Sequence, residues 1–239
     1  VLLTQANTPA TESSRIHGID AVELMTAQEK AQKIRDADLA TVSQLKQLRN
    51  PGHAITLQAS FDNLPRLAEF ADVYHGITTT DYPRFGRTLW EVDEMAAEWV
   101  FQQSTTDSNG LFGGKSAILL WEQGEGGIKR LRDAGATVVI TGLEAWGKAG
   151  IAVNQMNELK ASIYAGTVFD TNVAIMVPKG SENMTAIWAF CSSPEYSKAV
   201  RELNQKINVE YVYLNQVPFD LSRWQEIAAK QFPDGLPKP

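Results

Sequence analysis

Cysteine and histidine are scarce in this sequence, and their scarcity argues against several kinds of protein. One cysteine and three histidines among 239 residues are too few for a disulfide scaffold or for a zinc site built from Cys and His. No apolar run approaches the roughly 18–20 residues that span a membrane. The single cysteine, Cys191, stands in an apolar run, which is typical of a reduced core thiol in a cytoplasmic protein.

The chain also lacks an excess of basic residues. Its formal net charge is −6 at pH 7, whereas a nucleic-acid-binding domain usually carries a basic face. The acidity is concentrated, however, because residues 51–109 hold three basic and nine acidic groups and residues 110–180 hold seven and six. The overall charge therefore still allows a locally positive groove.

Length and composition are those of a globular protein. Apolar residues make up 44% and charged residues 21% of the chain, close to globular averages, and the length fits one large domain or one domain with an appended element. The sequence starts at Val1 without a basic or long apolar leader. We expect it to be a piece of a longer protein.

Residues 1–52 predict an extended lead-in followed by a long helix. Asp20 and Glu23 have the spacing of a capping box, and apolar residues between Leu24 and Leu48 recur about every seven residues. Asn50-Pro51-Gly52 is a stop signal. The pattern predicts one helix of about 28 residues over 20–49, or two helices with a break near 36–38. This helix would connect two domains or pack on its neighbour.

Residues 53–239 predict a mixed α/β domain of short strands with helices late in the chain. Residues 90–101 fit a helix or a mixed segment. Helices are expected at 184–191, after Ser193-Pro194 and from a capping box at Ser222–Gln225. Strands are expected at 55–59, 71–77, 117–121, 137–141, 151–156, 162–165, 173–177 and 211–217.

Two short motifs are typical of enzymes but lack the context that the chemistry needs. Residues 112–116 end in Gly-Lys-Ser like a phosphate-binding loop, but Asn109 stands where that loop has its first glycine. A glycine-rich turn is the better interpretation. Glu158 and Lys160 have the spacing of a metal-dependent nuclease, which also needs an upstream carboxylate. Asp133 is the nearest candidate, at a long spacing.

Histidine and tryptophan give no separate site. His17, His53 and His75 are far apart and are expected to be ordinary surface or core side chains. The six tryptophans are expected mostly in the core. Trp121 and Trp146 end strand-like runs and could instead form exposed stacking surfaces.

Six segments within residues 53–239 resemble, in the same order, target recognition domains of large adenine-specific DNA methyltransferases. The first segment carries the family's pattern A-x-x-x-x-G-I-x-T-x-D-x-x-x-F…W-E. The fifth resembles the family's terminal helices but has Cys-Ser-Ser-Pro where the family has L-N-S. The segments are FADVYHGITTTDYPRFGRTLWEV (Phe70–Val92), LFGGKSAILLWEQGEG (Leu111–Gly126), AWGKAGIAVNQMNEL (Ala145–Leu159), YAGTVFDTNVAIMVP (Tyr164–Pro178), TAIWAFCSSPEYSKAVRELNQKINV (Thr185–Val209) and VPFDLSRWQEIA (Val217–Ala228).

The resemblance implies a non-catalytic fragment that reads a DNA sequence for a type IIG restriction–modification or phage-defence enzyme. Residues 1–52 would be the lead-in and connecting helix, and residues 53–239 the target recognition domain. The family's Asn/Asp-Pro-Pro-aromatic motif and its S-adenosylmethionine loop are absent from this sequence. The cofactor S-adenosylmethionine and the catalytic methyltransferase domain are therefore expected elsewhere in the same longer chain. The expected partner is double-stranded DNA in the cytoplasm, and no membrane.

Direct readout of DNA uses side chains that donate and accept hydrogen bonds, such as Arg, Lys, Asn and Gln. No catalytic or metal-binding residue is expected in the fragment. The candidate DNA-binding residues form three groups: Thr78, Thr79, Thr80, Asp81, Arg84 and Arg87; Lys115, Lys129 and Arg130; and Lys148, Asn154 and Gln155. Two alternatives remain open: a protein-interaction module that uses the 20–49 helix, and a metal-dependent nuclease around Glu158 and Lys160.

Overall fold

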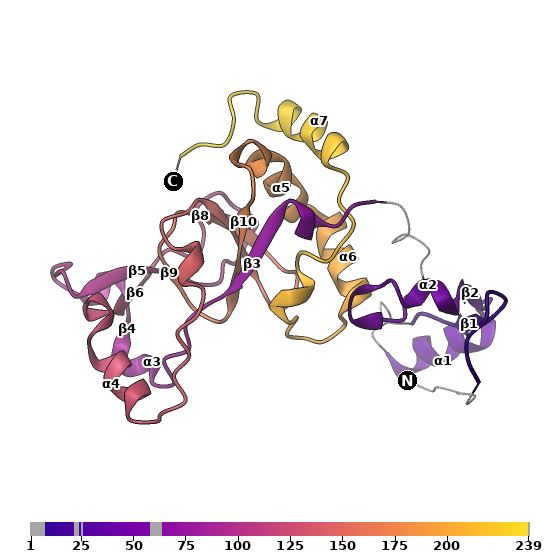
Figure 1. Ribbon diagram of the computed structural model, residues 1–239, viewed down its shortest axis with the longest axis horizontal. Coiled ribbons are helices and arrows are strands. Elements are labelled where there is room, and N and C mark those ends of the chain that lie inside the picture. The colour runs from indigo at the N-terminus through magenta and orange to yellow at the C-terminus, as the bar shows by residue number, and fades with distance from the viewer. Residues whose placement is uncertain (1–7, 22–23, 25, 58–63, 239) are drawn as a thin grey trace. The chain divides into compact units, whose positions relative to one another are not determined.

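The computed structural model describes residues 8–21, 24, 26–57 and 64–238. The chain divides into two units, Val1–Leu64 and Pro65–Pro239 (Figure 1). This division lies twelve residues beyond the boundary at 52/53 that the sequence suggests. Helices and several small sheets alternate along the chain, which confirms the mixed α/β class.

Unit 1 contains a two-stranded antiparallel sheet instead of one long helix. Its strands and helices are β1 (Arg15–Gly18), α1 (Ala27–Asp36), β2 (Ala40–Ser43), α2 (Gln44–Gln47) and the 3₁₀ turn η1 (Pro51–His53). The predicted continuous helix over 20–49 is therefore wrong, although the break near 36–38 is confirmed. The helix ends because the backbone turns extended at Ala37 and the next residues pair with β1.

The start of α1 also differs from the expectation. Thr26 and Glu29 form the capping box, in which the Thr26 hydroxyl accepts from the Glu29 backbone N–H and the Glu29 carboxylate accepts from the Thr26 N–H. Glu23 of the predicted box lies outside the described residues. The expected strand at 55–59 lies partly outside them too, and its described part, residues 55–57, contains no strand.

The first sheet of unit 2 is antiparallel, and its strands other than the edge strand β3 are buried on both faces. In spatial order its strands are β3 (Ala71–His75), β10 (Val173–Pro178), β7 (Gly150–Asn154) and β8 (Ala161–Tyr164). Met176 faces Cys191 of the covering helix α5 (Met184–Cys191), with their sulfur atoms 3.8 Å apart. Burial on both faces explains why β10 is a continuous apolar run and does not alternate.

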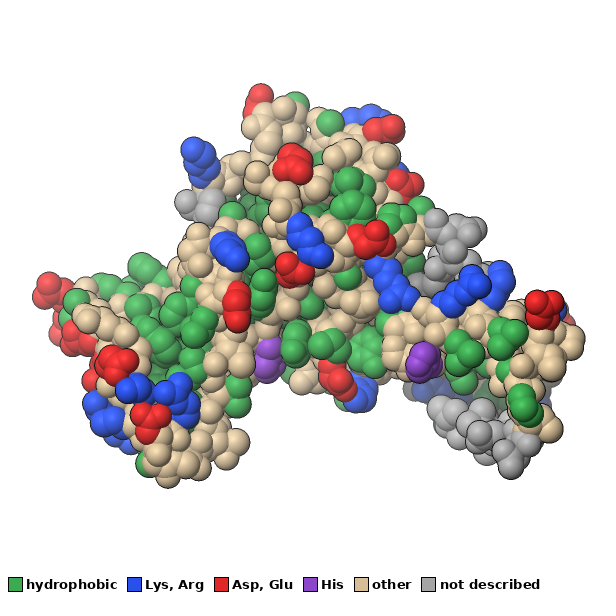
Figure 2. All heavy atoms as spheres, in the orientation of Figure 1, with side chains coloured by type: hydrophobic (Ala, Val, Ile, Leu, Met, Phe, Trp, Pro, Cys, Tyr) green, Lys and Arg blue, Asp and Glu red, His purple; other side chains and the backbone are tan. Residues whose placement is uncertain are grey.

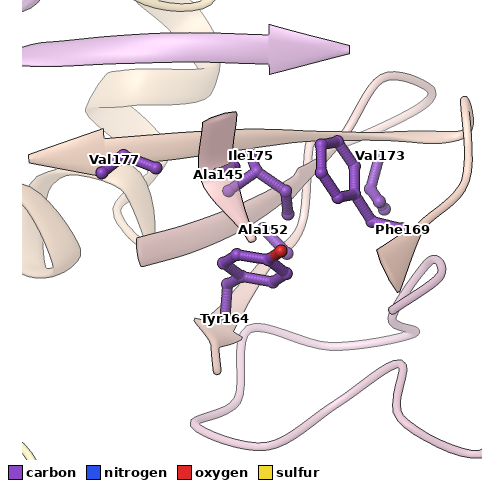
Figure 3. Close-up of a cluster of buried hydrophobic side chains, with 7 residues drawn as sticks. All are labelled: Ala145, Ala152, Tyr164, Phe169, Val173, Ile175 and Val177. Atoms are coloured by element: carbon purple, nitrogen blue, oxygen red, sulfur yellow. The ribbon is translucent and has the colours of Figure 1, made fainter. Parts of the chain in front are cut away.

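The opposite face of this sheet carries the first core of unit 2. Tyr164 and Phe169 contribute its two rings, which meet edge to face with centroids 5.7 Å apart. Figure 3 shows this core, which consists of Ala145, Ala152, Tyr164, Phe169, Val173, Ile175 and Val177.

The second sheet of unit 2 places its strands in the order β4 (Gly86–Thr88), β6 (Ala117–Leu120), β5 (Trp99–Gln103) and β9 (Val168–Phe169). The helices α3 (Tyr82–Phe85) and α4 (Gly127–Asp133) contribute Phe85 and Ile128 to the core on one face of this sheet. Val168 belongs to the same core, whereas the next residue, Phe169, belongs to the first core. The short parallel strand β9 therefore joins the two cores of unit 2.

The three late helices are α5 (Met184–Cys191), α6 (Pro194–Leu203) and α7 (Leu221–Gln231), and all three were expected from the sequence. Ser193 caps α6 as predicted, whereas Asp220 and not Ser222 caps α7. Cys191 is a buried core thiol whose pKa is raised by burial. The helices α5 and α7 pack together through Phe190 and Trp224, whose ring centroids are 5.1 Å apart.

Two segments of unit 2 lack the strands that were expected, and a third, residues 90–101, takes the mixed form that the sequence allowed. The predicted strand at 211–217 is wrong, because Tyr211 stacks on His75 with ring centroids 5.1 Å apart and the segment begins with a 3₁₀ turn. Residues 137–141 form only a single bridge, and residues 90–101 divide between a turn and β5. The 3₁₀ turns are η2 (Leu67–Glu69), η3 (Leu89–Glu91), η4 (Glu122–Gly124), η5 (Leu143–Ala145), η6 (Ser181–Asn183) and η7 (Tyr211–Tyr213). In the part of the chain described, no helix combines the length and apolarity needed to cross a membrane.

Candidate nucleic-acid interface

Three of the predicted DNA-binding residues, Thr78, Thr79 and Thr80, line one pocket of unit 2. Its volume is about 430 Å³, which lies within the usual range of sites for small ligands or single nucleobases. We call it the threonine pocket. It is also lined by Ile77, Tyr82, Pro83, Ser104, Asp170, Thr171 and Asn172.

The pocket forms where the chain leaving β3 runs beside the end of β9. The Ile77 N–H donates to the Phe169 carbonyl at 2.9 Å, and Ile77 bridges Asp170 in parallel. Gly76 permits this approach, because a Cβ atom there would lie only 2.3 Å from the Asp170 carbonyl oxygen. Backbone pairing therefore places the threonine segment next to Asp170, 90 residues later in the chain.

Asp170 is the charged group of the pocket. Its residue is 8% exposed, the Ser104 hydroxyl donates to Oδ2 at 2.6 Å, and the Asn172 N–H donates to Oδ1 at 2.9 Å. Among the ion pairs of the described residues, none involves this carboxylate. The pocket thus presents an acceptor that is held in place by two bonds and has no cationic partner.

The side of the pocket that precedes α3 is conformationally strained and rich in hydroxyl groups. Thr80 has φ of 59°, a left-handed conformation that is rare for a β-branched residue and recurs at functional sites. Burial raises the pKa of the Tyr82 phenol, and the carboxylates of Asp170 and Glu91 raise it further. The phenol therefore stays protonated at neutral pH and remains able to donate a hydrogen bond.

Arg84 and Arg87 follow the pocket-lining residues Tyr82 and Pro83 along the chain. Arg84 lies over the Phe85 ring, with Cζ 5.1 Å from the centroid, and Arg87 donates to the backbone carbonyls of Pro83 and Gly86. Neither guanidinium takes part in an ion pair within the described ranges. Hydrogen bonds from Thr88 lower the pKa of Glu91, and the charge of Arg87 lowers it further, so Arg87 acts on this carboxylate without forming an ion pair.

Lys115 joins this group through the loop before β6. The Ser104 N–H donates to the Gly114 carbonyl at 2.8 Å, so the loop lies next to a wall of the pocket. The Lys115 ammonium is 5.2 Å from the Phe112 ring centroid, and partial burial lowers its pKa. No ion pair within the described part of the chain involves Lys115. We call Arg84, Arg87 and Lys115 the free cations.

Lys129 and Arg130 are near the same end of unit 2 but are neutralised. The Lys129 ammonium lies 2.8 Å from Glu125 and 3.8 Å from Asp133, and Arg130 lies 3.6 Å from Glu122. Figure 2 shows basic and acidic side chains mixed over the region that carries α3 and α4. These two residues therefore contribute less to an anion site than the sequence suggests.

The third predicted group does not form a recognition surface. The Asn154 amide accepts from the Thr106 N–H at 3.0 Å and donates to the Thr106 carbonyl at 2.8 Å. Gln155 is 3% exposed and donates to the Thr171 carbonyl. Both amides are thus used within the fold, and Gln155 supports one wall of the threonine pocket. Lys148 is exposed in the turn after η5.

The structure also places in the pocket residues that the sequence did not single out. Tyr82 lines the pocket, whereas its predicted neighbour Asp81 is exposed and begins α3 without a side-chain capping bond. Ser104, Asp170 and Asn172 line it as well. The sequence offered one signal, because an Asp side chain often accepts from the backbone N–H two residues later, as Asp170 does from the Asn172 N–H.

The residues behind the nuclease alternative lie apart from any metal-binding cluster. Glu158 has a 74% exposed side chain and pairs with Lys160, and the described residues contain no group of three His, Cys, Asp or Glu that could hold a metal ion.

Residues 112–116 form the turn that was expected. Trp121 and Trp146 pack edge to face, with centroids 5.2 Å apart, and both are half-buried. They pack against each other and do not form an exposed stacking surface.

Comparison of the chain with models of known protein families and with curated proteins found no match.

Proposed function

We propose that this chain is the non-catalytic, DNA-sequence-recognition fragment of a larger S-adenosylmethionine-dependent, adenine-specific DNA methyltransferase or restriction–modification enzyme. The cofactor and the catalytic domain belong to the longer chain, and the partner of the fragment is double-stranded DNA. The six resembling segments, which occur in the family's order along residues 53–239, support this proposal.

The observation that carries the proposal is the convergence of three of these segments at one place. Phe70–Val92 and Tyr164–Pro178 supply most of the lining of the threonine pocket, and Leu111–Gly126 supplies Lys115 beside it. Segments far apart in the sequence thus combine hydroxyl groups and an acceptor in the pocket with free cations around it. A module that reads DNA needs both, because contacts to phosphates position a protein and contacts to base edges specify the sequence.

Charge gives the cations and the hydroxyl groups of the pocket different roles in this proposal. A methyltransferase flips its target base out of the stack, and another element must first locate the site. In this proposal the free cations bind phosphates, while the hydroxyl groups of the pocket meet base edges. Lys129 and Arg130 have a minor part, because their charges are balanced by Glu122, Glu125 and Asp133.

The alternatives have less support. The protein-interaction alternative required a helix over 20–49, and α1 is only ten residues long. The nuclease alternative required a second carboxylate beside Glu158, whose ion-pair partner in the described structure is Lys160. We therefore propose neither as a second function.

The test is selection from a duplex library with a randomised central segment, using the purified chain. We expect the bound fraction to be enriched in one sequence motif. Replacing the three free cations together (R84A/R87A/K115A) should weaken binding to the enriched duplex by at least about tenfold, because phosphate contacts are lost. The double variant K129A/R130A is the control for lost positive charge, and it should weaken binding much less than the triple variant, because in this proposal Lys129 and Arg130 make no phosphate contacts.

Two outcomes would reject the proposal. One is a bound fraction with the same sequence distribution as the input library. The other is a loss of binding in K129A/R130A that equals the loss in the triple variant, because binding would then follow total charge and not the free cations.

A further inference from the structure

We infer that the threonine pocket reads the exocyclic amino group of one DNA base, adenine N6 or cytosine N4, with Asp170 as the acceptor. This inference rests on the proposed function and deepens it, since it names the base chemistry that the pocket selects and the residue that selects it. Asp170 lies in the resembling segment Tyr164–Pro178 but is not among the DNA-binding residues that the sequence predicted.

An ionised carboxylate accepts hydrogen bonds and donates none. Its two oxygens offer about four acceptor positions, and Ser104 and Asn172 use one position on each oxygen. The carboxylate is largely buried and has no ion-pair partner among the described residues. A charged group in such a place is stabilised by a further donor, so the open side of the pocket favours a ligand that donates.

The four bases differ at one position of the major-groove edge, which carries a hydrogen-bond donor in two of them and an acceptor in the other two. In the major groove adenine and cytosine each present an amino group, whereas guanine and thymine present a carbonyl oxygen at the corresponding place. A carboxylate accepts from the amino group and repels the carbonyl oxygen. Asp170 would therefore admit A or C on the strand that it faces and exclude G and T.

The same charge decides which part of DNA enters the pocket. A phosphate is repelled by Asp170, while the free cations Arg84, Arg87 and Lys115 around the pocket attract it. The base edge and the backbone thus have separate places. The hydroxyl groups of Thr78 and Tyr82 can each donate or accept, so they accommodate the other atoms of either amino-bearing base.

The acceptor is also held rigidly, as a base reader requires. Asp170 follows β9 directly, and its N–H donates to the Gln103 carbonyl at 3.2 Å. The close approach at Gly76 fixes the distance between its backbone and the threonine segment. Gln155 bonds the next carbonyl along the chain, that of Thr171.

The experiment repeats the library selection with three proteins, the wild type, D170N and S104A. Asparagine is nearly isosteric but both donates and accepts, so D170N should accept all four bases at one position and leave the rest of the motif unchanged. The wild type should deplete G and T there by at least about tenfold. S104A removes a bond to Asp170 and keeps the carboxylate, so it should retain the A-or-C preference.

A second measurement does not depend on the folding of D170N. In the selected duplex the amino group is removed from the DNA, with purine in place of adenine or 2-pyrimidinone in place of cytosine. Binding of the wild type should fall by about tenfold or more. If D170N folds, the same base change should alter its binding by less than about twofold, since the two changes remove one shared contact.

The outcomes separate this inference from the proposed function. A wild-type motif that D170N leaves unchanged, or a wild type indifferent to loss of the amino group, overturns the inference alone. Loss of the whole motif in both D170N and S104A also overturns it, because Asp170 would then only support the loop. A wild type that enriches no motif rejects the inference and the proposed function together.

Discussion

At Gln102 the fold buries an amide whose nitrogen and oxygen both lack a hydrogen-bond partner among the described residues. The residue is 1% exposed and lies in β5 between Val168 of β9 and Ala117 of β6. A buried polar group without a partner costs about 1–3 kcal/mol of stability. Its neighbour Gln103 differs in part: its amide oxygen also has no partner among the described residues, but its amide nitrogen donates to the carbonyls of Ser104 and Gly113.

The two glutamines should therefore respond in opposite directions to the same substitution. Q102M keeps the volume and removes the unsatisfied amide, so we expect the free energy of unfolding to rise by about 1 kcal/mol. Q103M is the control and should lower it by about 1–3 kcal/mol, because two carbonyls lose their donor. Urea unfolding followed by fluorescence measures both. A destabilised Q102M would mean that Gln102 has a bonded partner, such as an ordered water molecule.

The candidate site could be predicted in part at the level of single residues. The polar run from Thr78 to Asp81 and the two arginines after it marked one side of the pocket. Asp170 was missed because the parallel bridge between Ile77 and Asp170 brings it to that side, and the sequence does not show that these distant residues pair. The neutralisation of Lys129 was visible in principle, because Glu125 lies four residues before it and such pairs meet on a helical path.

At the level of elements, several short strands and a helix with a clear capping signal were predictable. The strands at 71–77, 117–121 and 173–177 and the helix after Ser193 were all found. The prediction of one helix over 20–49 was wrong because a seven-residue apolar spacing does not show where the chain turns back to form a strand pair. The strand at 211–217 failed because Tyr211 stacks on His75, and its environment is set by that tertiary contact.

The cap of α6 offers a test at this level. The Ser193 hydroxyl accepts from the Tyr196 N–H at 3.3 Å and donates to the Phe190 carbonyl at 2.7 Å. S193A should lower the free energy of unfolding by about 1 kcal/mol, the usual cost of losing an N-cap. S192A is the matched control, because Ser192 donates only to carbonyls of its own helix, and it should change stability less. Equal losses would show that the cap at Ser193 adds nothing.

Over the whole molecule, the formal charge of −6 opposes DNA binding. This opposition is local in origin, since most of the excess acidity lies in residues 51–109. Of the five basic side chains in the first two predicted groups, two are held by carboxylates on or next to α4. Three free cations then remain as the effective contacts of the proposed interface, and their number fixes how strongly binding should depend on salt.

Each phosphate that a protein neutralises releases condensed counterions, so the logarithm of the binding constant falls with the logarithm of salt concentration by about 0.9 for each contact. Three free cations predict a slope of about −3 for the purified chain between roughly 50 and 200 mM salt. R87A should reduce the magnitude of this slope by about 1, whereas K129A should leave it unchanged, because Lys129 already neutralises Glu125. Fluorescence anisotropy with a labelled duplex measures all three slopes. A slope near zero would exclude phosphate contacts by the free cations, and an equal change in R87A and K129A would show that overall charge sets the affinity.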